Sequence, residues 1–595
     1  MSNGTRFTSL RLSRRHILGA AGATAAGAAL GATRPAWAAP GLLARATRAN
    51  AQEGSIFRMF YPNFPTLDPQ VVTNGMWFDA EGLLEGLVTL GAGGTEAVAA
   101  AAESWEVSED GLTYTFTLRD ATWSNGDPVT AEDFVWTYTR LLTAQGSSTG
   151  VTLGANSYQP ILQITGAVDH LNGVITDFAE VGIKALDEKT LEFTLDTANA
   201  EFPLLLTHPS MLPLHPASVE ASDDWVQPAN WVGNGPFVPT EWTVNTKIVL
   251  APNENYWNAA EIKLAGMEVQ LYEGANTQHA AAYEAGEVDL VGLPLADLIR
   301  YQADPELSQQ LHAATGGSVG YLATLRSKNP ILEDTNIRKA LSLALDRETI
   351  ALANPSTRPG PQLVPDSLAG WTEEDNTPSD VEQAKQILAD AGYPDGEGFP
   401  ELKILFGGTQ TNVQLEALAD TWQKNLGIKV ALDMQESGVY VERRWAVQEE
   451  DYIGFYFGTF GSTPTWSTWA ANLWGPQFIQ EFSLKSADWA EYQGLQNDQA
   501  IDPADKAAQL KELRDTRASE GAMAYVAAVA EAFTLPDPAA QQEALRAAAK
   551  LRQETYLIIP IYYADLYYAI KPEVGGIELI PGGLHFYYDT ITKGA

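Results

Sequence analysis

Cysteine is absent from all 595 residues of the chain. Its absence excludes disulfide bonds, thiolate metal sites, a cysteine nucleophile and a lipid-modified N-terminal cysteine. Basic residues are also scarce, with 37 Lys and Arg against 75 Asp and Glu and a net charge of −38. Such a surface repels nucleic acid and anionic lipid, so neither is an expected partner. The acidity favours solubility, and it is compatible with cationic ligands.

Sequence patterns that carry metal or nucleotide chemistry are missing too. No Walker A sequence and no internal repeat occurs, and the seven histidines lack the spacing of metal ligands. Residues 316–320 formally match the G-x-S-x-G nucleophile elbow around Ser318, but a strand-like YLATL follows where an elbow requires a helix. We therefore expect a hinge at these glycines and no cofactor or metal. A secreted serine hydrolase stays as the enzyme alternative.

The N-terminus has the features of an export signal. Arg14 and Arg15 precede an Ala- and Gly-rich run over residues 19–32, and Ala-Trp-Ala follows at 36–38. This pattern predicts a twin-arginine signal peptide over residues 1–38 and a flexible spacer over 39–54. No other run reaches the ~18 apolar residues that a membrane span requires, so we expect a soluble, exported protein in the periplasm or another extracytoplasmic space.

The length of the chain predicts more than one folded body. Single hydrophobic cores stop growing near ~250–300 residues, so 595 residues indicate two or three lobes. Residues 402–433 read as strand, helix and strand, an order typical of a parallel sheet. The fold class is therefore α/β.

Residues 101–142 form the most informative stretch. Apolar residues alternate on both flanks of Asp110-Gly111, which is the pattern of a β-hairpin. After a second turn at Asn125-Gly126, Thr130 is placed to cap a helix that runs to about Leu142. The stretch predicts a hairpin with an aromatic inner face, followed by a capped helix.

This stretch closely resembles the signature segment of the family 5 extracellular solute-binding proteins, the oligopeptide- and dipeptide-type binding components of ABC importers. The resemblance extends over most of residues 55–595 and is poorest at 501–553, where we expect a surface insertion of two Ala-rich helices. The matching segments are Glu103-Ser104-Trp105, Asp110-Gly111, Leu118-Arg119-Asp120, 125–133, Thr66-Leu67-Asp68-Pro69, Glu85-Gly86-Leu87, 181–195, 233–258, 280–290, 334–433 and 558–576.

The resemblance implies a two-lobed, periplasmic-binding-protein-like fold of type II, with an extra inserted domain and mixed sheets flanked by helices. Closure of the lobes over a small ligand, without chemistry, would precede delivery to the transmembrane subunits of an ABC permease. A monomer is expected. The predicted parts are lobe I (55–83, 178–316 and 560–595), a small inserted domain (84–177) and lobe II (317–559, with the helical insertion at 501–553).

The resemblance implies that a bound peptide adds as a β-strand between two walls of the ligand site. In this chain the walls would be residues 71–77 and the segment before Pro464. Family peptide binders read Gly-Trp-x-x-Asp-Tyr-x-x-Pro at the second wall. This chain has Phe457 for the Trp and Phe460 for the Asp that pairs with the ligand's ammonium group. A buried ammonium without a counter-charge is strongly disfavoured, so a free-amino peptide lacks its usual partner unless another carboxylate substitutes.

Phe457, Phe460 and Trp466 instead suggest an apolar stacking cleft, whereas Trp469 and Trp474 are expected to pack inside the lobe. A peptide or peptide-like ligand is the first hypothesis, and an oligosaccharide or another neutral solute is the alternative. The predicted substrate-binding residues are Asn74, Gly75, Met76, Trp77, Glu436, Ser437, Tyr456, Phe457, Gly458, Phe460 and Trp466.

Overall fold

The computed structural model describes residues 55–71, 80–143, 161–171, 173–273, 278–408, 411–461, 465–472, 475–498, 500–581 and 583–594. These residues belong to one compact unit, Arg48–Ala595. The predicted signal peptide and spacer lie outside the described residues. Across the described ranges, no helix is both long enough and apolar enough to cross a membrane.

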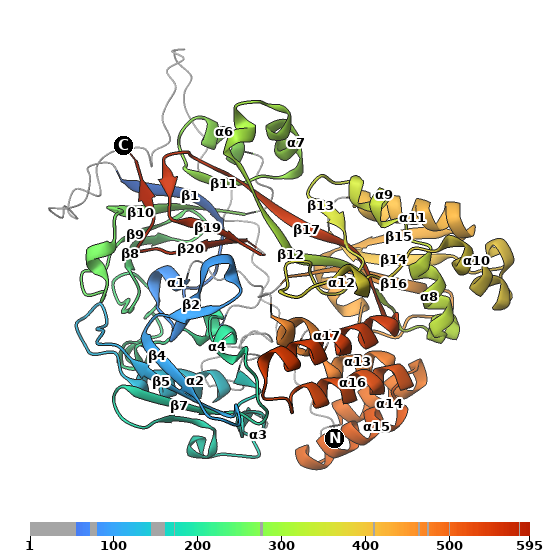
Figure 1. Ribbon diagram of the computed structural model, residues 1–595, viewed down its shortest axis with the longest axis horizontal. Coiled ribbons are helices and arrows are strands. Elements are labelled where there is room, and N and C mark those ends of the chain that lie inside the picture. The colour runs from blue at the N-terminus through green and yellow to red at the C-terminus, as the bar shows by residue number, and fades with distance from the viewer. Residues whose placement is uncertain are drawn as a thin grey trace, which may run out of the picture. The chain divides into compact units, whose positions relative to one another are not determined.

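The fold is built on one mixed sheet of eleven strands (Figure 1). Parallel pairs occur in both halves, β14 with β15 and β16, and β1 with β10 and β11. Strands β12 and β17 pair antiparallel between them, and β9 pairs antiparallel with β10 and β8 at one end. In pairing order the strands are β15 (Val430–Gln435), β14 (Leu402–Gly407), β16 (Ile453–Gly461), β12 (Leu311–Thr324), β17 (Ile558–Ile570), β11 (Leu290–Gly292), β1 (Ile56–Pro62), β10 (Gly266–Tyr272), β9 (Lys247–Pro252) and β8 (Phe237–Thr243), with β13 (Thr357–Pro359) also paired with β17.

Strands β12 and β17 are the long connection between the two halves of this sheet, and Figure 1 shows them running side by side. Their register shifts between Ala314 and Ser318, which marks a β-bulge. Gly316 lies in this bulge with φ +69°, a backbone conformation that favours glycine. Because Ser318 lies within a strand and not at a strand-to-helix turn, the nucleophile elbow is absent here. The hinge at these glycines stays a prediction.

The hairpin predicted around Asp110-Gly111 is confirmed. It belongs to a four-stranded antiparallel sheet in the order β4-β5-β7-β6, in which Tyr114 and Phe116 are buried as the aromatic inner face. Val107, by contrast, is 47% exposed. The strands are β4 (Ala102–Val107), β5 (Thr113–Leu118), β6 (Ile183–Ala185) and β7 (Thr190–Thr194), so this sheet extends past residue 177. Three two-stranded sheets pair β2 (Val88–Leu90) with β3 (Ala97–Ala99), β18 (Val574–Gly575) with β21 (Thr592–Lys593), and β19 (Ile577–Ile580) with β20 (Gly583–Phe586).

Helix α2 follows the hairpin as predicted, and the Asp133 carboxylate accepts the backbone N–H of Thr130 at 2.9 Å in its first turn. The predicted strand–helix–strand unit is likewise confirmed, because β14 and β15 pair in parallel on either side of α11. The helices are α1 (Ala80–Leu83), α2 (Ala131–Thr143), α3 (Ala167–Leu171), α4 (Phe202–Leu205), α5 (Pro216–Ala221), α6 (His279–Glu284), α7 (Leu295–Ala303), α8 (Thr335–Leu343), α9 (Arg347–Leu352), α10 (Val381–Asp390), α11 (Val413–Leu426), α12 (Ser437–Arg443), α13 (Pro476–Ser483), α14 (Ser486–Asn497), α15 (Pro503–Arg517), α16 (Glu520–Ala532) and α17 (Pro538–Glu554).

Residues 501–553 form three helices, α15 to α17, and not the two predicted. The prediction of a surface insertion is wrong for α16 and α17, because Tyr525, Val529 and Leu545 are buried in a core cluster. The Tyr525 hydroxyl donates to the carbonyl of Ala470 at 2.6 Å, which ties α16 to the segment before α13. Helices α16 and α17 are therefore part of this core, and α15 contributes Leu513 to a smaller buried cluster with Trp489 and Tyr492.

Strands β12 and β16 are buried on both faces of the sheet. Successive side chains of a strand point to opposite faces. Accordingly Tyr321 and Tyr456 belong to one core cluster, whereas Leu322 and Phe455 belong to another on the opposite face. Helices α16 and α17 contribute to the first cluster, and α8, α10 and α11 contribute to the second.

Candidate functional site

Strand β16 carries four of the predicted ligand-binding residues, Tyr456, Phe457, Gly458 and Phe460. The ring of Phe460 packs edge-on against Trp469, with centroids 5.7 Å apart, in the cluster that also buries Tyr456. Phe457 lies on the other face of the sheet, 6.2 Å from the ring of Tyr562. The expectation that Phe457 and Phe460 share one stacking surface is therefore wrong, because residues an odd number apart on a strand face opposite sides.

Trp466 and Trp469 are core residues in this structure. They are 2% and 0% exposed, and the indole N–H of Trp466 donates to the carbonyl of Ala369 at 2.8 Å. The packing role expected for Trp469 is confirmed. Burial also removes Trp466 from any surface that a ligand could reach in this conformation.

Glu436 and Ser437 lie at the N-terminus of α12. The Glu436 carboxylate accepts the backbone N–H groups of Gly438 at 3.0 Å and Val439 at 3.4 Å, so it caps the helix. Tyr440 of the same helix donates to the carbonyl of Phe457 at 2.7 Å and fixes α12 to β16. The remaining predicted ligand residues, Asn74, Gly75, Met76 and Trp77, as well as Trp474, lie outside the described residues.

A cavity of about 640 Å³ lies where β1, β11, β17 and β20 meet, and we call it the tyrosine cavity. Its walls are largely apolar and aromatic. Burial raises the pKa of Tyr568 to about 12, so this phenol stays neutral and can donate a hydrogen bond. The lining residues are Met59, Phe60, Tyr61, Pro62, Glu81, Leu90, Pro209, Tyr272, Leu290, Gly292, Leu293, Pro294, Leu295, Leu298, Ser356, Asp565, Leu566, Tyr567, Tyr568, Ile580, Gly583, Leu584, His585, Phe586 and Tyr588.

The strand register places the tyrosine cavity close to the end of β16. Ser318 of β12 pairs with Gly461 of β16 on one side and with Ala564 of β17 on the other. Adjacent strands are about 4.8 Å apart, so Gly461 lies about 10 Å from Ala564. Asp565, the next residue of β17, lines the cavity. The segment predicted to form a ligand wall thus ends beside this cavity.

Asp565 is held by a network of charges and backbone groups. Arg358 donates to both of its carboxylate oxygens, at 2.9 and 3.0 Å, and the backbone N–H of Gly316 donates at 3.0 Å. Arg358 also pairs with Asp366. These two carboxylates raise the pKa of Arg358, so the guanidinium stays charged. The network fixes the bulge of β12 against the rim of the cavity.

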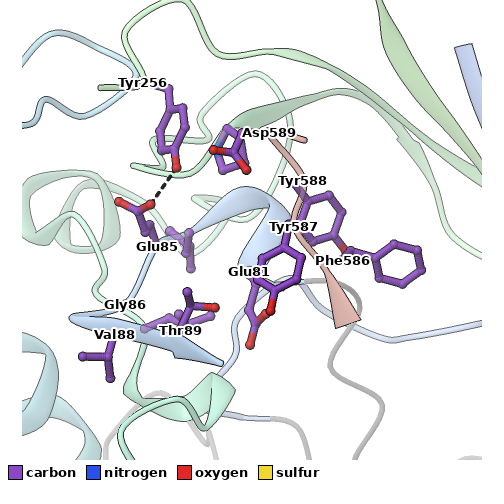
Figure 2. Close-up of a pocket in the computed structure, with 13 residues that line it drawn as sticks. Glu81, Glu85, Gly86, Val88, Thr89, Tyr256, Phe586, Tyr587, Tyr588 and Asp589 are labelled. Carbon is purple, nitrogen blue, oxygen red and sulfur yellow. Dashed lines mark hydrogen bonds between the residues drawn. The ribbon is translucent and has the colours of Figure 1, made fainter. Parts of the chain in front are cut away.

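A smaller cavity of about 70 Å³ shares Glu81, Phe586 and Tyr588 with the tyrosine cavity (Figure 2). The Glu85 carboxylate at its edge accepts the hydroxyl of Tyr256 at 2.6 Å, drawn as the dashed line, and the indole N–H of Trp257 at 2.8 Å. Burial raises the pKa of Glu85 to about 7, although both donors favour its ionised form.

The position of Glu85 is set by its backbone. The side chain of Asn234 accepts the N–H of Glu85 at 2.9 Å and donates to its carbonyl at 2.8 Å. The Glu85-Gly86-Leu87 match therefore marks a structural junction between α1 and the turn before β8. Among the described residues, no three His, Asp or Glu side chains gather in a way suited to a metal ion.

Sequence reasoning missed the tyrosine cavity. Its lining comes from segments more than 500 positions apart in the chain, from Met59 to Tyr588. No local sequence pattern predicts that these segments lie together. The one available signal is the aromatic content of the closing segment around Tyr567 and Tyr568, which the family resemblance singled out as a whole.

Known structures share this architecture of a long mixed sheet with a small added sheet. The murein tripeptide binding protein MppA of Escherichia coli aligns over 90% of this chain and 98% of its own, with a TM-score of 0.69 and 26% identity. An unliganded open form of MppA aligns with a TM-score of 0.68, also at 26% identity, over 91% of this chain and 98% of its own. The fold is therefore the two-lobed α/β fold of the periplasmic binding proteins.

Sequence comparison identifies the family. The model of the bacterial extracellular solute-binding proteins, family 5, middle region, matches residues 96–480, and the chain belongs to this family. The oligopeptide-binding protein OppA of Bacillus subtilis is 31% identical over 385 residues, which cover 62% of this chain and 68% of OppA. The probable deoxycholate-binding periplasmic protein YgiS of Escherichia coli is 31% identical over 399 residues, or 64% of this chain and 71% of YgiS.

Proposed function

We propose that this protein is the extracytoplasmic receptor of an ABC importer, capturing peptides or peptide-like solutes between two closing lobes. It hands the ligand unaltered to the transmembrane subunits of a permease and performs no chemistry. Membership of the solute-binding family supports the receptor role, and the similarity to an oligopeptide-binding protein supports the ligand class.

The observation that carries the proposal is the tyrosine cavity beside the end of β16. A volume of about 640 Å³ is in the range of cavities that enclose small ligands, and largely apolar walls with a few polar groups are typical of such sites. The five tyrosines in the lining combine apolar ring faces with hydroxyl groups, so they suit a ligand with mixed side chains. In this proposal a ligand contacts the cavity with one end and β16 with the other.

Export and organisation form part of the proposal. The twin-arginine leader over residues 1–38 directs the folded protein across the membrane, and the mature protein acts as a monomer. Lobe I comprises residues 55–83, 178–316 and 560–595, with a small domain of residues 84–177 inserted in it, and lobe II comprises 317–559. The inserted domain shares its four-stranded sheet with β6 and β7 of lobe I. The boundary between the lobes at 316/317 lies within β12, and the boundary at 559/560 lies within β17. These positions are compatible with a hinge where the two strands cross between the lobes.

The second candidate is a receptor for a non-peptide solute. The aromatic lining of the cavity suits an oligosaccharide ring or an amphipathic neutral molecule as well as a peptide side chain. The similarity to a probable deoxycholate-binding protein shows that relatives at this level of identity include one named for a non-peptide ligand. A serine hydrolase is disfavoured, because Ser318 lies mid-strand and its hydroxyl donates to the carbonyl of Phe460 at 3.0 Å.

A thermal-shift screen tests the proposal. A ligand present at about 100 times its dissociation constant adds about 2.7 kcal/mol to the free energy of unfolding. Di- to pentapeptides are compared with cello- and chito-oligosaccharides and with deoxycholate. Stabilisation by peptides is the expected result, and stabilisation by a sugar or deoxycholate alone would reject the peptide assignment. Turnover of ester or peptide substrates that is lost in Ser318→Ala would reject the receptor role.

A further inference from the structure

Two glycines line the tyrosine cavity, Gly292 at the end of β11 and Gly583 at the start of β20. Neither has the positive φ that favours glycine, so the backbone conformation admits other residues at both positions. Glycine loses more conformational entropy on folding than any other residue, so it is costly where the backbone does not require it. The lack of a side chain at these two positions therefore has another physical reason.

Packing does not exclude a side chain at either position. A Cβ atom at 292 would lie 3.8 Å from Cε1 of Tyr568, and one at 583 would lie 3.8 Å from the hydroxyl oxygen of the same tyrosine, which are ordinary van der Waals distances. Gly320 in β12 differs, because a Cβ there would come within 2.5 Å of the Tyr562 ring. Since Gly292 and Gly583 line the cavity, a longer side chain at either position would extend into it.

The two glycines flank one tyrosine ring from two strands. Gly292 pairs directly with Tyr568 across β11 and β17, so both residues lie on the same face of the sheet. The ring carbons of Tyr568 are nearest Gly292, and its hydroxyl is nearest Gly583. We call the space that these three residues bound the glycine pocket. It is apolar beside β11 and polar beside β20.

The Tyr568 hydroxyl is available to a ligand. Within the part of the chain that the structure describes, this hydroxyl has no hydrogen-bond partner. Burial raises the pKa of Tyr568 to about 12, so the phenol keeps its proton near pH 7 and acts as a donor. A neutral acceptor on a ligand, such as a peptide carbonyl, would complete its hydrogen bonding.

We propose that the glycine pocket receives a bulky apolar side chain of the ligand, and that Tyr568 donates a hydrogen bond to a neutral acceptor beside it. This inference rests on the proposed receptor function and specifies the ligand class as a neutral segment with at least one large side chain. The missing Cβ atoms at 292 and 583 let that side chain lie against the backbone of β11 and β20, and its burial provides affinity. Gly292 and Gly583 thus determine the size of side chain that the receptor accepts.

The test uses four tripeptides that differ in one side chain. Ala-Ala-Ala is compared with Phe-Ala-Ala, Ala-Phe-Ala and Ala-Ala-Phe, so that phenylalanine is offered at each position. Titration calorimetry at pH 7 measures each dissociation constant on the full-length protein and on Gly292→Val, Gly583→Val and Tyr568→Phe. Gly494→Val is the matched control, because a Cβ at this position in α14 meets no atom within 4 Å and the residue does not line the cavity.

We expect at least one phenylalanine peptide to bind the parent protein at least about tenfold more tightly than Ala-Ala-Ala, a difference of about 1.4 kcal/mol. Gly292→Val and Gly583→Val should remove most of this preference, because the valine methyl groups occupy the pocket, and should leave the affinity for Ala-Ala-Ala nearly unchanged. Tyr568→Phe should weaken the binding of all four peptides about fivefold and keep the preference, because it removes the donor and leaves the ring. Gly494→Val should match the parent protein.

Three results separate the inference from the function beneath it. No preference for any phenylalanine peptide in the parent protein, or an equal loss for all four peptides in both glycine variants, would overturn the glycine pocket while peptide capture stands. Unchanged affinities in Tyr568→Phe would overturn the role of the hydroxyl. If neither these tripeptides nor any peptide of the thermal-shift screen binds, the proposed function fails and this inference fails with it. The comparison on the parent protein does not depend on any variant folding.

Discussion

Replacing Glu201 with glutamine should shift this protein toward an open state and weaken its ligand binding. Glu201 precedes α4 in the predicted lobe I, and its carboxylate accepts the backbone N–H groups of Trp466 at 2.9 Å and Ser467 at 2.6 Å in the predicted lobe II. Gln541 of α17 adds a neighbouring link, since its side chain donates to the carbonyl of Ala198 at 2.8 Å. If the lobes separate, these bonds must break.

The size of the effect follows from the two hydrogen bonds. A hydrogen bond to a charged group contributes about 1.5–3 kcal/mol. Glutamine keeps one acceptor oxygen but loses the charge, and its amide places N–H groups opposite a backbone N–H. We expect a loss of about 2 kcal/mol from the closed state, which corresponds to a shift of about 30-fold in the closing equilibrium. The apparent dissociation constant of a ligand that needs the closed form rises by up to the same factor.

The absence of native cysteine makes the measurement direct. Glu109→Cys in the predicted inserted domain of lobe I and Glu520→Cys in the predicted lobe II, both at exposed positions, accept spin labels without background labelling. Double electron–electron resonance should show longer distances in Glu201→Gln than in the parent protein when no ligand is present. Glu220→Gln is the control, because its carboxylate accepts the Trp136 indole at 3.0 Å on the lobe I side alone. Identical distance distributions in Glu201→Gln and its parent would refute the reasoning.

Three further predictions concern stability and the ligand wall. The pKa of Glu85 is about 7 in the folded protein and 4.5 in the unfolded chain, so the stability from this group is present below pH 4.5 and is lost as the pH rises to 7. Urea unfolding should show the free energy of unfolding declining by at most about 3 kcal/mol over this range, and Glu85→Gln should abolish the decline. An unchanged decline in Glu85→Gln would contradict the assignment. Gly316→Ala should lower the stability of the protein more than Gly126→Ala. Both glycines have positive φ, but only the new Cβ at position 316 comes close to other atoms, with Asp366 Oδ1 at 2.8 Å. Equal losses of stability, each about 1–2 kcal/mol, would show that the bulge relaxes freely. Phe460→Asp should raise affinity for free-amino peptides in calorimetry while lowering stability by about 3 kcal/mol through the lost contact with Trp469, and unchanged affinity would mean that β16 is not the ligand wall.

Local patterns predicted the elements well where periodicity and turn chemistry agree. The alternation around Asp110-Gly111 and the helical spacing after Asp334 both describe short-range preferences that the structure keeps. The burial of helices α16 and α17 was predicted wrongly because the two faces of an alanine-rich helix differ little in hydrophobicity. The sequence therefore does not distinguish a buried alanine from an exposed one.

The ligand wall was harder to predict than the elements that form it. Aromatic content at Phe457, Phe460 and Trp466 indicated an apolar surface, but the strand period of two separates the phenylalanines and packing buries the tryptophan. The tyrosine cavity depends on long-range strand order, with β1 between β11 and β10, which no local window encodes.

The most direct test of the receptor account is to expose the purified protein to a defined mixture of tripeptides, remove unbound material and record native mass spectra. The account predicts one peptide per protein chain, enriched in sequences with apolar side chains, and recovery of the same intact peptides on denaturation. A spectrum with no bound peptide, or with cleaved peptides, would contradict it.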